Sequence, residues 1–207
     1  MKSANLQITD YDVAGSRKDG DIAVLSAEMS EVLTQELDGA SLALGVSADD
    51  ILLAALGRAI QRTIGEGVAA VDLLGHGRTM YPVQLSCVGP QRVDATEMLA
   101  GVHHMTAAAS LRRTVHGVPD DPHAQPLSDI LFANETCEPE PAGLGHLLEL
   151  YAHRRGEVLV LDWWYDAPSF ERHTIQELSE QLPYALVELT SEAAAPVLAG
   201  TELAMAH

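Results

Sequence analysis

LLGHGR, at residues 73–78, closes an apolar run that begins at Val68. Two glycines and a basic residue after such a run predict a tight turn, because glycine accepts backbone angles that other residues avoid. The run itself scarcely alternates between apolar and polar residues, which is typical of an inner strand covered on both faces. The hexapeptide therefore marks the end of a buried strand.

The segment before this strand, DDILLAALGRAI at residues 49–60, predicts a buried helix. Ser47 is suited to cap it, and Asp49 and Asp50 fall in its first turn, where the helix dipole favours negative charge. Apolar residues occupy nearly every side of the helix, so we expect it between layers of the fold and not on the surface.

Helix and strand patterns alternate in the first half of the chain, and strands dominate the second. The patterns predict strands at 22–25, 68–74, 81–88, 128–134, 146–153 and 158–165. They predict further helices at 27–37, about 95–115 and 171–188. Ser26 is expected to cap the first of these helices, which should end at Asp38-Gly39, and Pro183 to bend or break the last.

The last two strands are expected to form a hairpin, and the late strands a meander. This order of elements predicts an α/β fold with a mixed β-sheet and helices packed mainly on one face. We expect one domain at residues 21–192, an irregular lead-in at 1–20 with one candidate strand at 6–8, and a flexible tail at 193–207.

The composition excludes several classes of protein. Of 207 residues, 47% are hydrophobic, which suits a globular core. Acidic residues number 30 against 12 basic, a net charge of -18 that disfavours nucleic acid and anionic lipid as partners. That charge either suits a basic partner or is a general compositional bias. No run of about 18 apolar residues and no leader pattern is present, so we expect a cytoplasmic protein without a membrane span.

Few residues have the spacing of a known chemical site. The sequence has no phosphate loop, dinucleotide fingerprint, zinc spacing or Gly-x-Ser-x-Gly elbow, so we expect no metal and no bound cofactor. Cys87 lies in a predicted strand and is expected to be a buried thiol. Trp163 and Trp164 should point to opposite faces of their strand. One should lie in the core, and the other should either pack as a structural side chain or contact a ligand or a partner.

Five motifs in order resemble the second half of a nonribosomal peptide synthetase condensation or epimerization domain. They are LSAEMSEVLTQEL at 25–37, DILLAALGRAI at 50–60 followed by VDLLGHGR at 71–78, TMYPVQL at 79–85, DILFANET at 129–136 and the hairpin LLELYAHRRGEVLVLDWWYD at 147–166. The resemblance covers roughly residues 22–192. It implies a single lobe of the chloramphenicol acetyltransferase-like fold.

The catalytic motif of that family is His-His-x-x-x-Asp-Gly, in the first lobe of a domain about twice as long. Here His103-His104 lacks the aspartate and the glycine, so both histidines are interpreted as surface residues of a helix. The resemblance implies no catalytic residue in this chain. It implies interface or structural roles for His76, Arg78, Asn134, Trp163 and Trp164, with Arg78 matching an arginine that braces the catalytic motif and Asn134 one place from the family's asparagine.

The resemblance implies a partial condensation-type domain of a nonribosomal peptide or polyketide assembly line. Such a domain transfers acyl or peptidyl groups held as phosphopantetheine thioesters on carrier proteins, and the missing lobe would supply the histidine. The alternative is a non-catalytic docking module for a carrier protein or acyltransferase. Expected partners are other synthase domains or subunits and a carrier protein. A single lobe should also expose an apolar face and so associate with a partner lobe or with itself.

Overall fold

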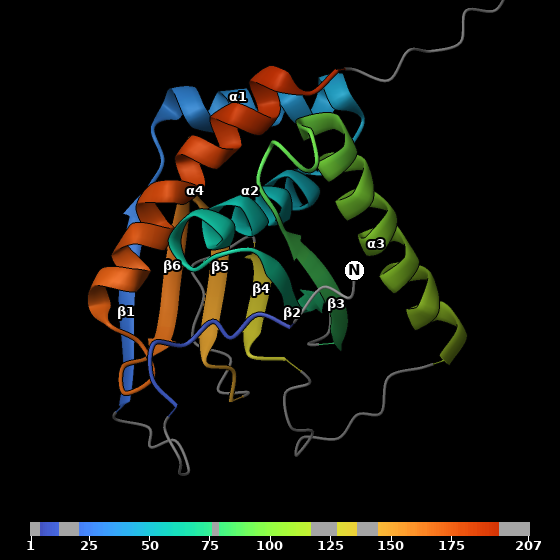
Figure 1. Cartoon of the computed structure of the whole chain (residues 1–207). Coiled ribbons are helices and arrows are strands. Elements are labelled where there is room, and N and C mark those ends of the chain that lie inside the picture. Colours follow the sequence, from blue (N-terminus) through green and yellow to red (C-terminus); the bar gives the residue numbers. More distant parts are fainter. Residues whose placement is uncertain (1–4, 13–20, 76–78, 117–127, 136–144, 195–207) are drawn as a thin grey trace, which may run out of the picture.

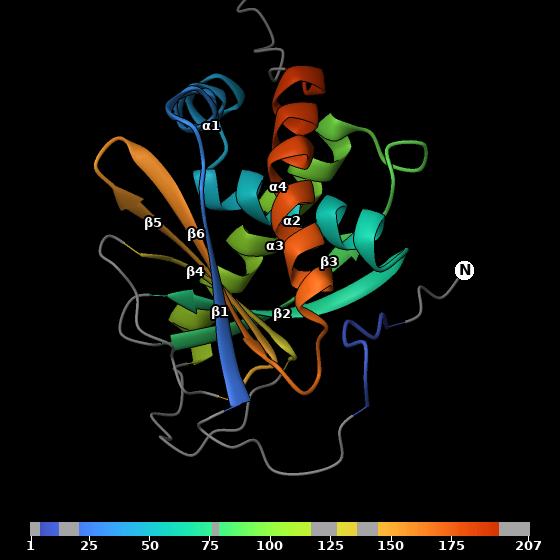
Figure 2. The same cartoon turned by 90° about the vertical axis from the view of Figure 1, so that its left-hand side faces the viewer.

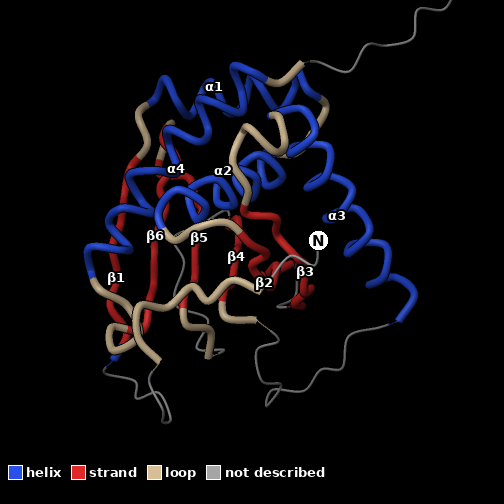
Figure 3. The backbone as a smooth tube through the Cα atoms, viewed as in Figure 1, coloured by secondary structure: helices blue, strands red, loops and turns tan. Residues whose placement is uncertain are grey.

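The centre of the fold is a six-stranded mixed sheet with strand order β1-β6-β5-β4-β2-β3 (Figures 1 and 3). The computed structural model describes residues 5–12, 21–75, 79–116, 128–135 and 145–194. The strands are β1 (Ile22–Glu28), β2 (Gly67–Gly75), β3 (Thr79–Cys87), β4 (Ile130–Glu135), β5 (Leu148–Arg155) and β6 (Val158–Asp166). β4 runs parallel to both β2 and β5, and the remaining pairs are antiparallel. The predicted mixed sheet is confirmed.

Four helices within the described ranges pack mainly on one face of this sheet (Figure 2). They are α1 (Glu31–Leu44), α2 (Ala48–Thr63), α3 (Ala95–His116) and α4 (Arg172–Glu192). Side chains alternate along the strands, so one set from each strand meets the helices and the other set forms the opposite face. The predicted packing of helices on one face is confirmed.

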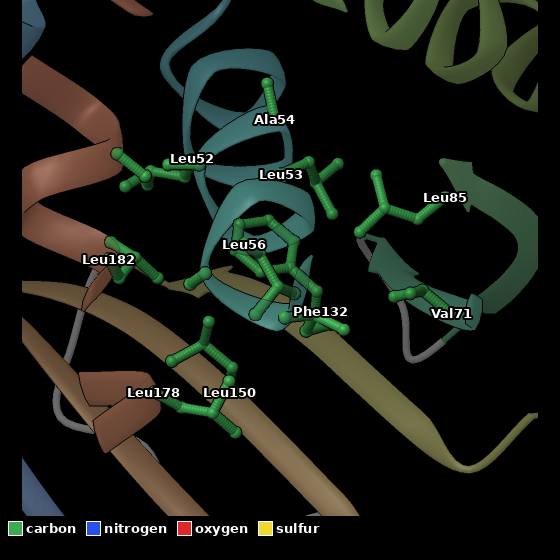
Figure 4. Close-up of a cluster of buried hydrophobic side chains, with 14 of the residues drawn as sticks. Leu52, Leu53, Ala54, Leu56, Val71, Leu85, Phe132, Leu150, Leu178 and Leu182 are labelled. Carbon is green, nitrogen blue, oxygen red and sulfur yellow. The ribbon is translucent and has the colours of Figure 1, made fainter. Parts of the chain in front are cut away.

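Helix α2 is the element on which the core is built. Every residue from Asp50 to Ile60 is buried, as the all-round apolar pattern predicts. Ser47 caps the helix, since its hydroxyl accepts from the Asp50 backbone N–H and the Asp50 side chain accepts from the Ser47 backbone N–H, a reciprocal capping box. Figure 4 shows side chains of α2 among those of α4 and the sheet: Leu52, Leu53 and Leu56 from α2, Leu178 and Leu182 from α4, and Val71, Phe132 and Leu150 from the strands.

Gly57 marks the closest approach of α2 to β3. A Cβ at this position would lie 2.8 Å from the Ser86 carbonyl oxygen and 2.9 Å from Met98 Cε. Because a backbone oxygen cannot turn aside as a side chain can, Gly57→Ala should lower the free energy of unfolding by about 1–3 kcal/mol in urea denaturation. Gly39→Ala is the control, because nothing lies within 4 Å of a Cβ there in α1. It should raise stability by up to about 1 kcal/mol, and equal losses at both positions would contradict the packing.

The boundary between β1 and α1 differs from the prediction. β1 continues to Glu28, and Ser26 lies within it and donates its hydroxyl to Asp162 Oδ1 at 2.5 Å. The cap of α1 is instead Ser30, whose Oγ accepts from the Leu33 N–H at 3.2 Å. Pairing with β6 along all of β1 outweighs the capping preference of Ser26, so the helix starts later. It also runs past Asp38-Gly39 and ends at Gly45, where φ is 68°.

Three further predictions about the elements need correction. β4 and β5 are parallel, so the late strands are not a meander, although β5 and β6 form the predicted hairpin. α4 is not broken at Pro183, because the buried Leu182 and Ala185 on either side hold it against α2. Residues 6–8 form no strand, and the lead-in contacts the sheet through a bridge from Asn5 to Val68.

Candidate functional site

A cavity of about 370 Å³ lies between α2, α3 and the carboxyl ends of β2 and β4. Ligands of open α/β sheets commonly bind beyond the carboxyl ends of parallel strands. The lining residues come from four elements and the turn before α2: Ser47, Asp49, Asp50, Leu53, Leu73, Leu74, His103, Thr106, Ala107, Phe132 and Asn134. Figure 1 shows α2 above the sheet and α3 to the right of β3.

Asp50 connects α2 with α3 at the cavity wall. Its carboxylate is 3% exposed and lies 2.6 Å from the Thr106 hydroxyl, which donates to it, and 2.8 Å from His103 Nδ1. Burial raises the pKa of Asp50, but the hydrogen bonds from Thr106, His103 and Ser47 outweigh burial, and the net pKa is lowered. A charged Asp50 can only accept hydrogen bonds, so His103 Nδ1 carries the proton.

His103 is therefore oriented by a buried carboxylate. Its side chain is 45% exposed and lines the cavity, whereas the adjacent His104 is exposed. In a neutral imidazole one nitrogen donates and the other accepts, so with Nδ1 directed at Asp50 the free acceptor is Nε2. The prediction of a surface residue is confirmed for His104. His103 is also partly exposed, but its ring contacts Asp50, a contact that the sequence does not show because α3 packs against the start of α2 only in the fold.

Asp49 and Asn134 also line the cavity. The Asn134 side-chain amide donates to Asp49 Oδ1 at 2.5 Å. Burial raises the pKa of Asp49, the Asn134 hydrogen bond lowers it and the charge of Asp50 raises it, with a net rise. Two neighbouring carboxyl groups thus have their pKa values moved in opposite directions. Asn134, expected at an interface, belongs to this site.

The two aspartates should affect stability with opposite signs. The lowered pKa of Asp50 stabilises the fold above its unfolded pKa of about 4, and this stabilisation is lost as the pH falls through the folded value. Asp50→Asn should cost about 1.5–3 kcal/mol at pH 7 and less in acid. The raised pKa of Asp49 makes its ionisation destabilising as the pH rises, so Asp49→Asn should stabilise at pH 7. Denaturant titrations at several pH values measure both effects. A change of stability in the same direction for the two variants would contradict the assignment.

The other predicted site residues lie away from this cavity or outside the described ranges. Trp163 is fully buried in the core on the helix side of the sheet, and Trp164 is half-buried on the opposite face, so the predicted division is confirmed. His76 and Arg78 fall outside the described residues. Cys87 is the predicted buried thiol, and burial raises its pKa to about 12.

A set of buried polar pairs on the helix-free face was not predicted. His146 Nε2 lies 2.9 Å from Asp72 Oδ2, with both side chains fully buried, and His153 Nε2 lies 2.9 Å from Asp162 Oδ2. The alternation of the hairpin strands places Glu149, His153 and Asp162 on one face, yet a polar face is usually exposed. The sequence thus shows that these polar residues share a face of the sheet but does not show that this face is buried.

The structure gives no evidence for a bound metal among the residues it describes. In these ranges no group of three or more His, Cys, Asp or Glu side chains could hold an ion. Within the same ranges no individual helix has the length and apolar character to cross a bilayer, and α1 and α2 meet both criteria only when taken together as a bent pair.

Comparisons with known proteins point to assembly-line synthases. No family model matches the chain. A subunit of the phenolphthiocerol/phthiocerol polyketide synthase is 32% identical over 221 residues, in both Mycobacterium tuberculosis and Mycobacterium bovis. The match covers 84% of this chain but 15% of each relative, so the chain spans a small part of the proteins it resembles.

Solved structures determine the fold family. The epimerization domain from the third module of tyrocidine synthetase B matches 92% of this chain and 52% of its own, with a TM-score of 0.70 and 20% identity. The condensation domain of Monacolin K polyketide synthase matches 94% and 54%, with a TM-score of 0.66 and 12% identity. The chain folds as one half of a condensation-type domain.

Proposed function

We propose that the chain is the C-terminal lobe of a condensation-type domain in a polyketide or nonribosomal peptide assembly line. It acts with a complementary lobe on acyl groups that carrier proteins hold as phosphopantetheine thioesters. The observation that carries this proposal is the combination of a half-domain fold with a polyketide synthase polypeptide as a relative. The complementary lobe supplies the catalytic histidine, because this sequence lacks the His-His-x-x-x-Asp-Gly motif.

Apolar surface near the β1 edge supports association with another lobe. Val24 in β1 is 48% exposed and is paired in register with Trp164 in β6. Both side chains lie on the face of the sheet opposite the helices, as the strand alternation requires. Large aromatic side chains beside exposed aliphatic ones are typical of interface centres. This is the surface we assign to the complementary lobe or a second copy.

The test mixes the chain with the adjoining lobe of the synthase that contains it, and measures amide or ester formation from a thioester-loaded carrier protein. Product should form only when both lobes are present. It should persist at saturating acceptor in His103→Asn and in the control His104→Asn. Loss of turnover in His103→Asn alone would show that this chain supplies the catalytic histidine, and would overturn the proposal.

The second candidate is a docking module without catalysis. The exposed Val24 beside the half-buried Trp164 favours it equally, since binding a carrier protein or an acyltransferase needs no histidine. Stable binding of either partner without turnover in the mixed assay would select this candidate.

A further inference from the structure

We propose that the cavity beside α2 binds the hydroxyl group of a small, uncharged, partly apolar alcohol. His103, held by Asp50, accepts the hydrogen bond from that hydroxyl. All the residues that carry this inference come from the one chain, so it stands whether or not a complementary lobe exists.

The polar part of the site is an acceptor with a fixed orientation. Asp50 is nearly buried and directs Nδ1 of His103 toward itself at 2.8 Å, and Thr106 donates to the other carboxylate oxygen at 2.6 Å. The ring therefore presents Nε2, which in the neutral imidazole accepts a hydrogen bond and cannot donate one. A ligand group that meets this nitrogen must be a donor, as a hydroxyl is.

The charges around the cavity select a neutral ligand. Anions are repelled by Asp49 and Asp50, which both line it. Cations gain little from Asp50, because its oxygens already accept from Ser47, Thr106 and His103. Asp49 adds little for a cation, since its Oδ1 already accepts from the Asn134 amide. The ligand group that the cavity favours is therefore an uncharged hydrogen-bond donor.

Beside the polar Ser47, Thr106 and Asn134, part of the wall is apolar and gives room for a carbon skeleton. Leu53 comes from α2, Leu73 and Leu74 from β2, and Phe132 from β4. A volume of about 370 Å³ is at the lower end of the range, roughly 300–1,000 Å³, that small-molecule sites occupy. The site therefore suits a small molecule with one aliphatic or aromatic body and one hydroxyl.

The experiment uses the chain alone with benzyl alcohol as the probe, followed by NMR with ¹⁵N-labelled histidine. The free protein should show His103 as the Nδ1-protonated tautomer. Benzyl alcohol should shift the His103 Nε2 resonance with a saturable curve, whereas toluene should not. His103→Asn should weaken binding roughly tenfold, the loss of one hydrogen bond, and His104→Asn should leave it unchanged.

The asparagine variant is chosen because its amide can still donate to Asp50 and so keeps the contact between α2 and α3. A second variant, Ala107→Leu, fills the cavity from an exposed position of α3 and should also abolish binding. Three results would overturn the proposal: an Nε2-protonated His103, toluene binding as tightly as benzyl alcohol, or benzylammonium binding more tightly in a manner that Asp49→Asn removes.

Discussion

Arg58→Ala is expected to lower the free energy of unfolding by about 3–5 kcal/mol, enough to unfold a marginal domain. Arg58 lies in the middle of α2 with no exposed side-chain surface, and its guanidinium donates to the carbonyl oxygens of Val88 and Val93. Removing it leaves the two carbonyl oxygens without their buried donor, removes one of the two arginines that pair with Glu188, and opens a cavity beside the helix. Urea denaturation followed by circular dichroism measures the loss.

Arg62→Ala is the matched control, because Arg62 pairs with the same Glu188 from the next turn of α2. Its side chain is 26% exposed, so water can replace the lost ion pair and the expected cost is at most about 1 kcal/mol. Similar losses for the two variants would show that Glu188, and not the carbonyl groups, determines the role of Arg58.

His146→Ala is expected to cost a similar amount, about 3–5 kcal/mol, because it removes a fully buried partner of the fully buried Asp72. The pair links β2 to the residues just before β5, two elements that are not adjacent in the sheet. Its loss should therefore loosen the parallel part of the sheet. Hydrogen exchange of the β2 and β4 amides would report this together with the denaturation midpoint.

Two variants test whether the buried pair is the cause. His146→Gln retains an amide donor near the position of Nε2 and should lose less than His146→Ala. His153→Ala removes a donor from Asp162 but leaves it the hydroxyl of Ser26. If His146→Gln were as unstable as His146→Ala, the packing of the ring and not its hydrogen bond would explain the loss.

The sequence predicts the core elements because their patterns are local. An apolar helix with Ser47 before it and two aspartates in its first turn folds as α2 in any context that buries it, and the β5–β6 hairpin follows from alternation and a short turn. The α1 boundary fails for the opposite reason. Ser26 and Ser30 are both acceptable caps, and pairing of β1 with β6 selects between them.

The candidate site is less accessible to sequence reasoning because its contacts are distant along the chain. His103 and Asp50 are separated by 53 positions, and Asn134 and Asp49 by 85. Neither pair has a recognisable spacing, so only the packing of α3 and β4 around α2 shows that they meet. Arg58 illustrates the same limit, since its carbonyl partners lie in the connection between β3 and α3.

Association of this chain with the complementary lobe that we propose for it is the measurement that tests the central claim most directly. Sedimentation velocity should show the chain alone self-associating with rising concentration, and a 1:1 complex when the adjoining lobe is added. Trp164→Ser should weaken that complex, with Tyr184→Ser, on the exposed side of α4, as the control. A chain that stays strictly monomeric and does not bind the adjoining lobe would contradict the account of a half-domain that works through its partner.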